Sequence, residues 1–325
     1  MAVYTALGAE SLAELIAAYD VGELVSAKGI AEGVSNSNWL IETRGRDGAG
    51  ARFILTMYER RIDTAELPFF LDLLDHLAAK GCAVPATIHD RSGDSLRDVA
   101  GKAVALIAFL PGVSPSVPTP DQARAVGEAL ARVHLAARDF PGQRRDRLDP
   151  AANLAALERC GADRLAAIDP ALPEALALAR DITPRWPVEL PRSIIHSDLF
   201  PDNVLMLGKR VTGLIDFYFA CEGMMAYDLA VTHAAWAFRD GGATFSPGIG
   251  AALVSGYEAV RQLEPEERAA LPVLAQGACL RFTASRAEDW LDTPAQAQVS
   301  RKDPMDFLRR WQFYRANGAA AFADG

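Results

Sequence analysis

Apolar and polar positions alternate along much of the first third of the chain, which predicts β-strands. Three segments have this pattern, at residues 23–30, 38–43 and 52–58. A polar, glycine-containing turn joins the first two. Apolar residues then recur at helical spacing from Leu67 to Ala78, with Asp63 or Thr64 as the N-cap and Gly81 as the stop. A further apolar run at residues 99–110 predicts a strand that ends before Pro111.

After Pro120 the pattern becomes helical, and Asp121 is predicted to cap a helix that runs to about Ala137. Strands return only between residues 193 and 218, as three short segments at 194–195, 204–207 and 211–217 with a turn at residues 208–209. The chain then reads as helical again beyond Ala226. This order predicts an α+β protein with two lobes, a strand-rich lobe over residues 1–110 and a mainly helical lobe over residues 111–325, with a hinge near residues 108–112.

Composition excludes several classes of partner. The chain has 325 residues and a formal charge of −9, which argues against broad binding to nucleic acid because that requires basic surface. No apolar run is long enough to span a membrane, and the first residues lack the pattern of a signal peptide. Four cysteines stand far apart without metal-ligand spacing, so we expect buried thiols in the reducing cytoplasm. Composition gives no basis for an oligomeric state.

The candidate chemistry lies in the strand-rich segment of the second lobe, which reads IIHSDLFPDNVLM and then VTGLIDFYFA. Asp198 follows an apolar strand, Asn203 opens the next strand, and Asp216 ends the return strand. The pattern predicts two carboxylates and one amide converging on one cleft, and these hard oxygen ligands suit Mg²⁺. The alternative for each aspartate alone is an ordinary turn or cap residue. The joint spacing instead matches kinases, in which the first Asp accepts the hydroxyl proton and the Asn and second Asp hold metal. His196 is expected to orient the loop.

These motifs resemble the protein-kinase-like phosphotransferases that act on small molecules, the aminoglycoside phosphotransferase and choline kinase superfamily. The resemblance extends to the kinase-like homoserine kinases through GIAEGVSNSNWLIET, ELPFFLDLLDHLAAKG, EALARVHLA, RFTASRAEDWL and KDPMDFL. It implies a two-lobed kinase fold, ATP and Mg²⁺ as cofactors, and phosphorylation of the side-chain hydroxyl of L-homoserine in threonine biosynthesis. In that reading Asp198 is catalytic, and Asn203 and Asp216 are metal ligands. Asp228 resembles the structural aspartate of the family at a helix start, and we expect it to cap that helix.

The same resemblance suggests where ATP binds. The turn with Ser35, Asn36 and Ser37 occupies the place of the phosphate-covering loop, although an ordinary hairpin has the same composition. Phe109 and Leu110 belong to the hinge beside adenine. Thr56 stands where most kinases carry a lysine that pairs with phosphate, so another cation must contribute. The candidates are Lys28, Arg60 and Arg61.

Substrate recognition leaves more alternatives open. The candidates for reading the substrate are Arg281, Arg286 and Trp236, which are also residue types that commonly form salt bridges or pack in a core. A phosphotransferase for another hydroxyl compound is the first competing function, with an aminoglycoside, choline, methylthioribose or a sugar as the acceptor. The second is a non-catalytic nucleotide-binding module, and only the absence of the strand-three lysine favours it.

Overall fold

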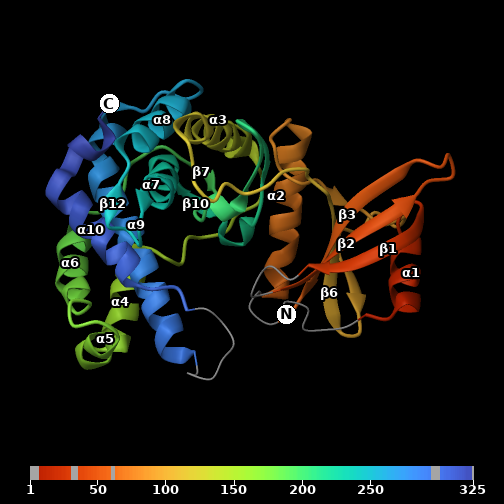
Figure 1. The fold of residues 1–325 in the computed structure, drawn as a ribbon, viewed down its shortest axis with the longest axis horizontal. Helices are drawn as coiled ribbons and strands as arrows, with labels where there is room; N and C mark the ends of the chain where they lie inside the picture. The colour runs from red at the N-terminus through yellow and green to blue at the C-terminus, as the bar shows by residue number, and fades with distance from the viewer. Residues whose placement is uncertain (1–6, 31–35, 60–62, 294–300, 324–325) are drawn as a thin grey trace. The chain divides into compact units, whose positions relative to one another are not determined.

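The computed structural model describes residues 7–30, 36–59, 63–293 and 301–323 (Figure 1). Its contacts divide the chain into two units. The first comprises the described residues up to Gly112, together with Phe140–Gly142 and Thr212–Tyr218, and the second holds the remainder. The chain therefore leaves the first unit after Gly112 and returns to it twice, and the second return contains Asp216.

The alternating pattern of the first third builds an antiparallel sheet with the order β1-β2-β3-β6-β4, in which β5 also pairs with β6. Its strands and the helices of this unit are α1 (Ala9–Ala17), β1 (Glu23–Ile30), β2 (Asn36–Arg44), β3 (Gly50–Tyr58), the 3-10 turn Thr64–Glu66, α2 (Leu67–Ala79), β4 (Thr87–Ile88), β5 (Arg97–Val99) and β6 (Lys102–Ala108). Asp63, one of the two predicted N-caps of α2, instead caps the 3-10 turn that leads into this helix, since its side chain accepts the Ala65 N–H. Helix α2 itself begins after Glu66 and has no side-chain cap.

Side chains of this sheet alternate between two hydrophobic clusters because successive residues of a strand face opposite sides. One cluster joins α1 to residues such as Trp39, Leu55 and Met57, which alternate along β2 and β3. The other joins α2 to Tyr58 and Ala105. The sheet therefore has one face covered by α1 and another that carries α2, and this assignment decides which polar side chains share a face.

Two features of the first unit differ from the sequence prediction. Residues 99–110 do not form one strand, because Ala100 and Gly101 adopt positive φ and turn β5 back onto β6. The Gly101 N–H is held by the side chain of Asp98 at 2.9 Å. Helix α1 was not predicted, although its buried Leu12, Leu15 and Ile16 recur at helical spacing.

The second unit is mainly helical. Its elements are α3 (Pro120–Ala136), the 3-10 turn Ala137–Asp139, α4 (Pro150–Cys160), α5 (Ala162–Ile168), α6 (Glu174–Ile182), the 3-10 turn Thr183–Arg185, β7 (Arg192–Ile195), the 3-10 turn Pro201–Asn203, β8 (Val204–Leu207), β9 (Arg210–Leu214), the 3-10 turn Phe217–Phe219, β10 (Cys221–Met224), α7 (Met225–Trp236), β11 (Phe238–Arg239), β12 (Thr244–Phe245), α8 (Pro247–Glu258), α9 (Pro265–Asp292), α10 (Met305–Asn317) and the 3-10 helix Gly318–Phe322. The predicted α+β fold with an antiparallel sheet and a helical remainder is confirmed. The last residues of β9 belong to the first unit.

Two helices form the centre of this unit. Every residue of α7 is buried, and α9 packs against α7, α4 and α10. Helices α3 and α8 approach closely at two glycines, since a Cβ on Gly127 would lie 2.1 Å from the Leu253 carbonyl oxygen and one on Gly256 would lie 2.0 Å from that of Arg124. Backbone contact of this kind has no room for a side chain.

In the second unit, two predicted boundaries differ from the structure and one strand was not predicted. The N-cap of α3 is Thr119 rather than Asp121, because Thr119 and Gln122 form a capping box and Pro120 takes the first helical position. Strand β9 ends at Leu214, so Asp216 lies beyond the strand rather than within it. Strand β10, which pairs with β7, was not predicted because its four residues carry no alternating pattern.

Candidate active site

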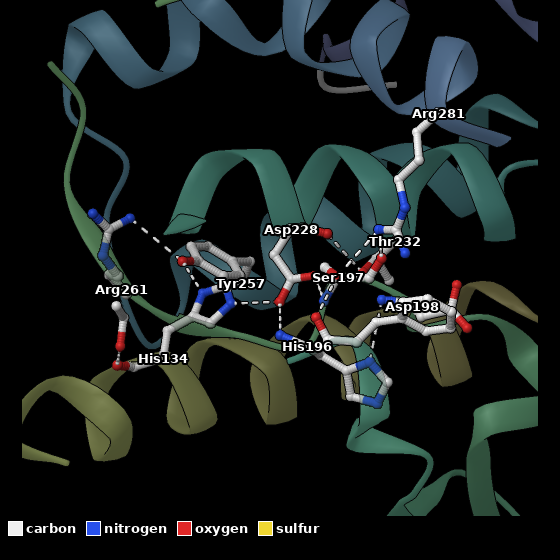
Figure 2. A network of polar contacts seen from close by, with 11 residues as sticks. His134, His196, Ser197, Asp198, Asp228, Thr232, Tyr257, Arg261 and Arg281 are labelled. Atoms are coloured by element: carbon white, nitrogen blue, oxygen red, sulfur yellow. Dashed lines mark hydrogen bonds and ion pairs between the residues drawn. The ribbon is translucent and has the colours of Figure 1, made fainter. Parts of the chain in front are cut away.

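The candidate catalytic loop begins where β7 ends, and one buried carboxylate holds its backbone. Asp228 of α7 accepts the N–H groups of His196 and Ser197, each at 2.7 Å, and a ring nitrogen of His134 at 2.9 Å (Figure 2). Ser197 has φ +60°, a backbone conformation that costs a non-glycine residue energy. The two bonds to Asp228 offset that cost and fix the direction in which the next residue, Asp198, leaves the strand.

The role predicted for Asp228 is therefore refined. It does lie at the start of α7, but its oxygens bind the catalytic loop instead of capping its own helix. Burial raises the pKa of this carboxyl, but hydrogen bonds from the His134 ring and from the His196 N–H oppose burial, and the pKa lies below its usual range. Asp228 is thus an ionised anchor under physiological conditions.

A chain of polar side chains continues from this anchor into α3 and α8. His134 Nδ1 lies 2.8 Å from the hydroxyl of Tyr257, which accepts from Arg261 at 3.4 Å. Arg261 in turn binds both oxygens of Glu267, at 2.9 and 2.8 Å. Because the arginine can only donate, the tyrosine proton is left to donate to His134 Nδ1, and Nε2–H then donates to Asp228. Figure 2 shows the contacts among His134, Tyr257, Arg261 and Asp228. The direction of the hydrogen bonds selects one tautomer of His134.

Arg281 and Trp236, predicted to read the substrate, instead hold the loop. The Arg281 guanidinium comes from α9 and donates to the carbonyl oxygen of Ser197 and, at 3.1 Å, to its hydroxyl (Figure 2). The Trp236 indole N–H donates to the Leu199 carbonyl at 3.0 Å. Both side chains are at least 97% buried. Their donors serve carbonyl groups of the loop, which corrects their predicted assignment to substrate.

The predicted role of Arg286 in reading the substrate is corrected in the same way. Its guanidinium donates to the Asp303 carbonyl at 2.9 Å and to an Asp306 carboxylate oxygen at 3.0 Å, and it lies 4.7 Å from the centre of the Phe307 ring. These contacts join α9 to the start of α10. The buried position lowers the pKa of this guanidinium, with Asp306 opposing the shift. Arg286 therefore organises the segment around residues 303–306.

Asp198 and Asn203 are in direct contact, as the kinase pattern requires. The Asn203 side-chain amide donates to the Asp198 carbonyl at 2.8 Å and approaches a carboxylate oxygen of Asp198 at 3.4 Å. His196 is buried, and its Nδ1 accepts the Asp198 N–H at 3.2 Å, which is the orienting role expected of it. Burial raises the pKa of Asp198, while the positive charges of Arg281 and Lys302 act in the opposite direction. A raised pKa makes this carboxylate a better proton acceptor.

Asp216 belongs to the first unit, where it is exposed and adopts φ +66°. Its negative charge contributes, after burial, to raising the pKa of Tyr58 to about 12, and the Tyr218 hydroxyl donates to Tyr58 at 3.2 Å. The donor chemistry of Asp216 and Asn203 fits Mg²⁺. Asn203 donates to Asp198 through its amide nitrogen, which leaves the amide oxygen as a hard ligand, and Asp216 offers an exposed carboxylate.

The predicted nucleotide residues divide between the faces of the sheet in the first unit. Thr56 is buried and donates to the Asn38 side-chain oxygen at 2.8 Å, and Asn36 alternates onto the same face. Ser37 lies on the face covered by α1, where its hydroxyl donates to Glu59 at 2.7 Å. Its predicted hydroxyl contact with phosphate is therefore corrected. Ser35 lies outside the described residues.

The predicted hinge residues and candidate cations lie in or next to the first unit. Phe109 and Leu110 directly follow β6, and Arg52 stands 4.2 Å over the Phe109 ring. Lys28 is exposed on β1, whereas Arg60 and Arg61 lie outside the described residues. The ion pair between Lys102 and Glu59 was not predicted, because the two residues are 43 positions apart and the pairing of β3 with β6 brings them together.

The carboxylate and amide pair on a loop after a short strand, held by a buried aspartate, defines a protein-kinase-like phosphotransferase. The chain belongs to the phosphotransferase enzyme family, whose model matches residues 26–263, and within it groups with proteins named homoserine kinase. One from Gluconobacter oxydans is 46% identical over 321 residues, which is 97% of this chain and 99% of the relative. Another from Acidiphilium cryptum is 45% identical over 322 residues, 99% of each chain.

Solved structures show the same fold. An amicoumacin kinase in complex with AMP-PNP, Ca²⁺ and Ami superposes with a TM-score of 0.70 at 13% identity, over 96% of this chain and 95% of that chain. A spectinomycin phosphotransferase in complex with ADP and spectinomycin has a TM-score of 0.69 at 14% identity, over 98% and 99%. Crossing a bilayer would take a longer or more apolar helix than any in the described ranges.

Proposed function

We propose that this protein transfers the γ-phosphoryl group of ATP to the side-chain hydroxyl of L-homoserine, which gives O-phospho-L-homoserine and ADP. The Asp198–Asn203 pair supports the reaction class, because it is the arrangement that positions a hydroxyl for phosphoryl transfer. The relatives named homoserine kinase support the acceptor, since they match almost the whole length of the chain rather than the shared kinase core alone. An aqueous, ATP-supplied compartment such as the cytoplasm suits this reaction.

The chemistry follows from the loop. The substrate oxygen forms a bond to the γ-phosphorus, the bond from that phosphorus to the bridging oxygen of ADP breaks, and the hydroxyl proton passes to Asp198. Mg²⁺ held by the Asn203 amide oxygen and the Asp216 carboxylate would neutralise charge on the phosphates. The positive charges near Asp198 favour its ionised form, and Asn203 holds the carboxylate in place. Positioning of this kind supplies a large part of the rate in kinases.

The test is turnover by the purified protein with Mg-ATP and a panel of acceptors. The panel contains L-homoserine, choline, an aminoglycoside, methylthioribose and a sugar. We expect O-phosphohomoserine, identified by mass spectrometry, and the highest kcat/KM for L-homoserine. Asp198→Ala should lower kcat by at least about 10³-fold.

Asp181→Ala is the matched control, because it removes an exposed aspartate whose partner is Arg185 one turn away. It should keep wild-type kcat. A clear preference for another acceptor would overturn the substrate, and full activity in Asp198→Ala would overturn the mechanism. Nucleotide binding without turnover of any acceptor would support a non-catalytic module instead.

A further inference from the structure

Among the described residues, the charges of three basic side chains besides His196 interact with that of Asp198, namely Arg281, Arg286 and Lys302, and two of the three are already engaged by the protein. Arg281 donates to Ser197, and Arg286 donates to Asp303 and Asp306. The third is Lys302, whose charge acts on Asp198 together with that of Arg281. Within the described ranges, no carboxylate lies at ion-pair distance from the Lys302 ammonium, and the side chain is exposed. Lys302 is therefore the cation near the catalytic carboxylate that is left for a ligand.

The Lys302 side chain also lies over an aromatic ring near Asp198. Its ammonium lies 5.8 Å from the centre of the Phe200 ring, and Phe200 follows Asp198 by two residues. Phe200 packs against Phe282 at 4.9 Å and Phe307 at 5.9 Å between ring centres. The Phe200 N–H donates to the Asp198 carbonyl at 2.9 Å. Lys302 thus rests on an aromatic surface that is tied to the catalytic loop itself.

The proposed substrate has an anion at a matching place. Four bonds separate the homoserine hydroxyl oxygen from its carboxyl carbon, which is roughly 5 Å in an extended chain. A hydroxyl at Asp198 would leave the carboxylate to meet a cation a short distance away. An ammonium makes a charge-assisted hydrogen bond with such an oxygen, and these are stronger than neutral ones.

We propose that Lys302 binds the carboxylate of the amino-acid substrate, an inference that rests on the proposed function. The lysine then selects acceptors in which a carboxylate accompanies the hydroxyl. It contributes to specificity rather than to the chemical step, because the proton passes to Asp198. An acceptor without a carboxylate gains nothing from this contact.

The test compares two acceptors that differ only in the carboxylate, L-homoserine and 3-aminopropan-1-ol. In Lys302→Ala we expect kcat/KM for homoserine to fall by about 10²-fold, mostly through KM, while the value for 3-aminopropan-1-ol changes less than about 3-fold. Lys302→Arg should recover part of the loss. Lys209→Ala, which removes an exposed lysine paired with Asp121, should match wild type with both acceptors. The exposed position of Lys302 predicts an unchanged melting temperature in Lys302→Ala.

Each other result overturns the inference in a distinct way. An equal loss with both acceptors, or a rise in KM for ATP alone, would assign Lys302 to phosphate or to the loop. Unchanged kinetics in Lys302→Ala would remove it from the site. If the wild-type protein does not phosphorylate homoserine at all, the proposed function fails and the inference about Lys302 falls with it, so the wild-type and variant assays separate the two failures.

Discussion

The pKa of Asp198, the proposed proton acceptor, is subject to two opposing influences. Burial raises its pKa, and the nearby positive charges limit that rise. A carboxylate whose pKa is raised accepts a proton more readily than one in water. Among the charges that lower the pKa of Asp198, that of Arg281 has the largest effect. A substitution of Arg281 therefore tests how this pKa controls activity.

Replacing Arg281 by glutamine should move the acid limb of the activity profile. Without the guanidinium, the pKa of Asp198 rises further, so more of the enzyme is protonated at a given pH and inactive. The pH at which kcat/KM is half-maximal on the acid side should therefore shift upward. We also expect kcat at its plateau to fall by on the order of 10²-fold, because the Ser197 carbonyl loses its donor. A pH–rate profile separates the two effects.

Arg281→Lys is the matched control for charge. It keeps a positive charge but cannot reproduce the planar guanidinium, so its acid limb should stay close to that of the wild type while its plateau falls. An unshifted acid limb in Arg281→Gln would contradict the assignment of Asp198 as the proton acceptor.

Tyr257 is predicted to act on catalysis through His134. Tyr257→Phe removes the proton donor of a buried imidazole and should cost about 1–3 kcal/mol of stability. Because the tautomer of His134 is then no longer selected, the bonds of Asp228 to the loop weaken and kcat should fall while KM for ATP changes little. Thermal unfolding and steady-state kinetics measure the two effects.

The chain offers a close control for this substitution. Tyr314 makes the same type of bond to a buried histidine, with its hydroxyl 2.6 Å from His233 Nδ1, but this bond joins α10 to α7. Tyr314→Phe should lose a similar amount of stability and keep its kcat. Equal effects on kcat in the two variants would mean that Tyr257 has only a structural role.

At the scale of elements, the sequence predicted what depends on local patterns. The alternating residues of β2 and β3 and the helical spacing of α2 appear in the structure because one face of each element is buried. Strand β1 is mostly exposed and is held by its pairing with β2. The pattern failed where a single turn decided the outcome, as at Ala100 and Gly101, where positive φ divides one apolar run into two strands. It also failed at α3, where Thr119 competed with Asp121 for the cap.

The packing of α3 against α8 connects this scale to catalysis, because α3 carries His134 and α8 carries Tyr257. Gly127→Ala and Gly256→Ala should each destabilise the protein by about 2 kcal/mol or more, since the new Cβ meets a backbone carbonyl of the facing helix. Both variants should lower kcat as well, because separating the helices lengthens the bond between His134 and Tyr257.

Gly248→Ala provides the comparison within α8. A Cβ there would meet only a Pro120 side-chain atom at 4.0 Å, so we expect stability equal to or slightly above that of the wild type and normal kinetics. Thermal unfolding of the three variants is the measurement. Tolerance of alanine at both Gly127 and Gly256 would contradict the close helix contact.

At the scale of the whole molecule, the residues of the candidate site were predictable by type, but several of their partners were not. Asp198, Asn203 and Asp216 follow from spacing in one short segment. Arg281 and Trp236 were recognised as important, yet they bind the loop instead of a substrate, because they lie 84 and 37 residues from their partners and only the tertiary fold pairs them. Lys302, at the far end of the chain, gave no signal of its own beyond the motif that contains it.

We predict that turnover depends on a divalent cation. In the proposed function the protein supplies few Mg²⁺ ligands, and Mg²⁺ is usually bound together with phosphate oxygens, so we expect a metal that arrives with ATP. EDTA should therefore leave the melting temperature of the free protein unchanged but abolish turnover, and excess Mg²⁺ should restore it. Asp216→Ala should need more Mg²⁺ for half-maximal activity, whereas Asp181→Ala should not. A fall in melting temperature with EDTA alone would instead indicate a metal bound permanently to the folded protein.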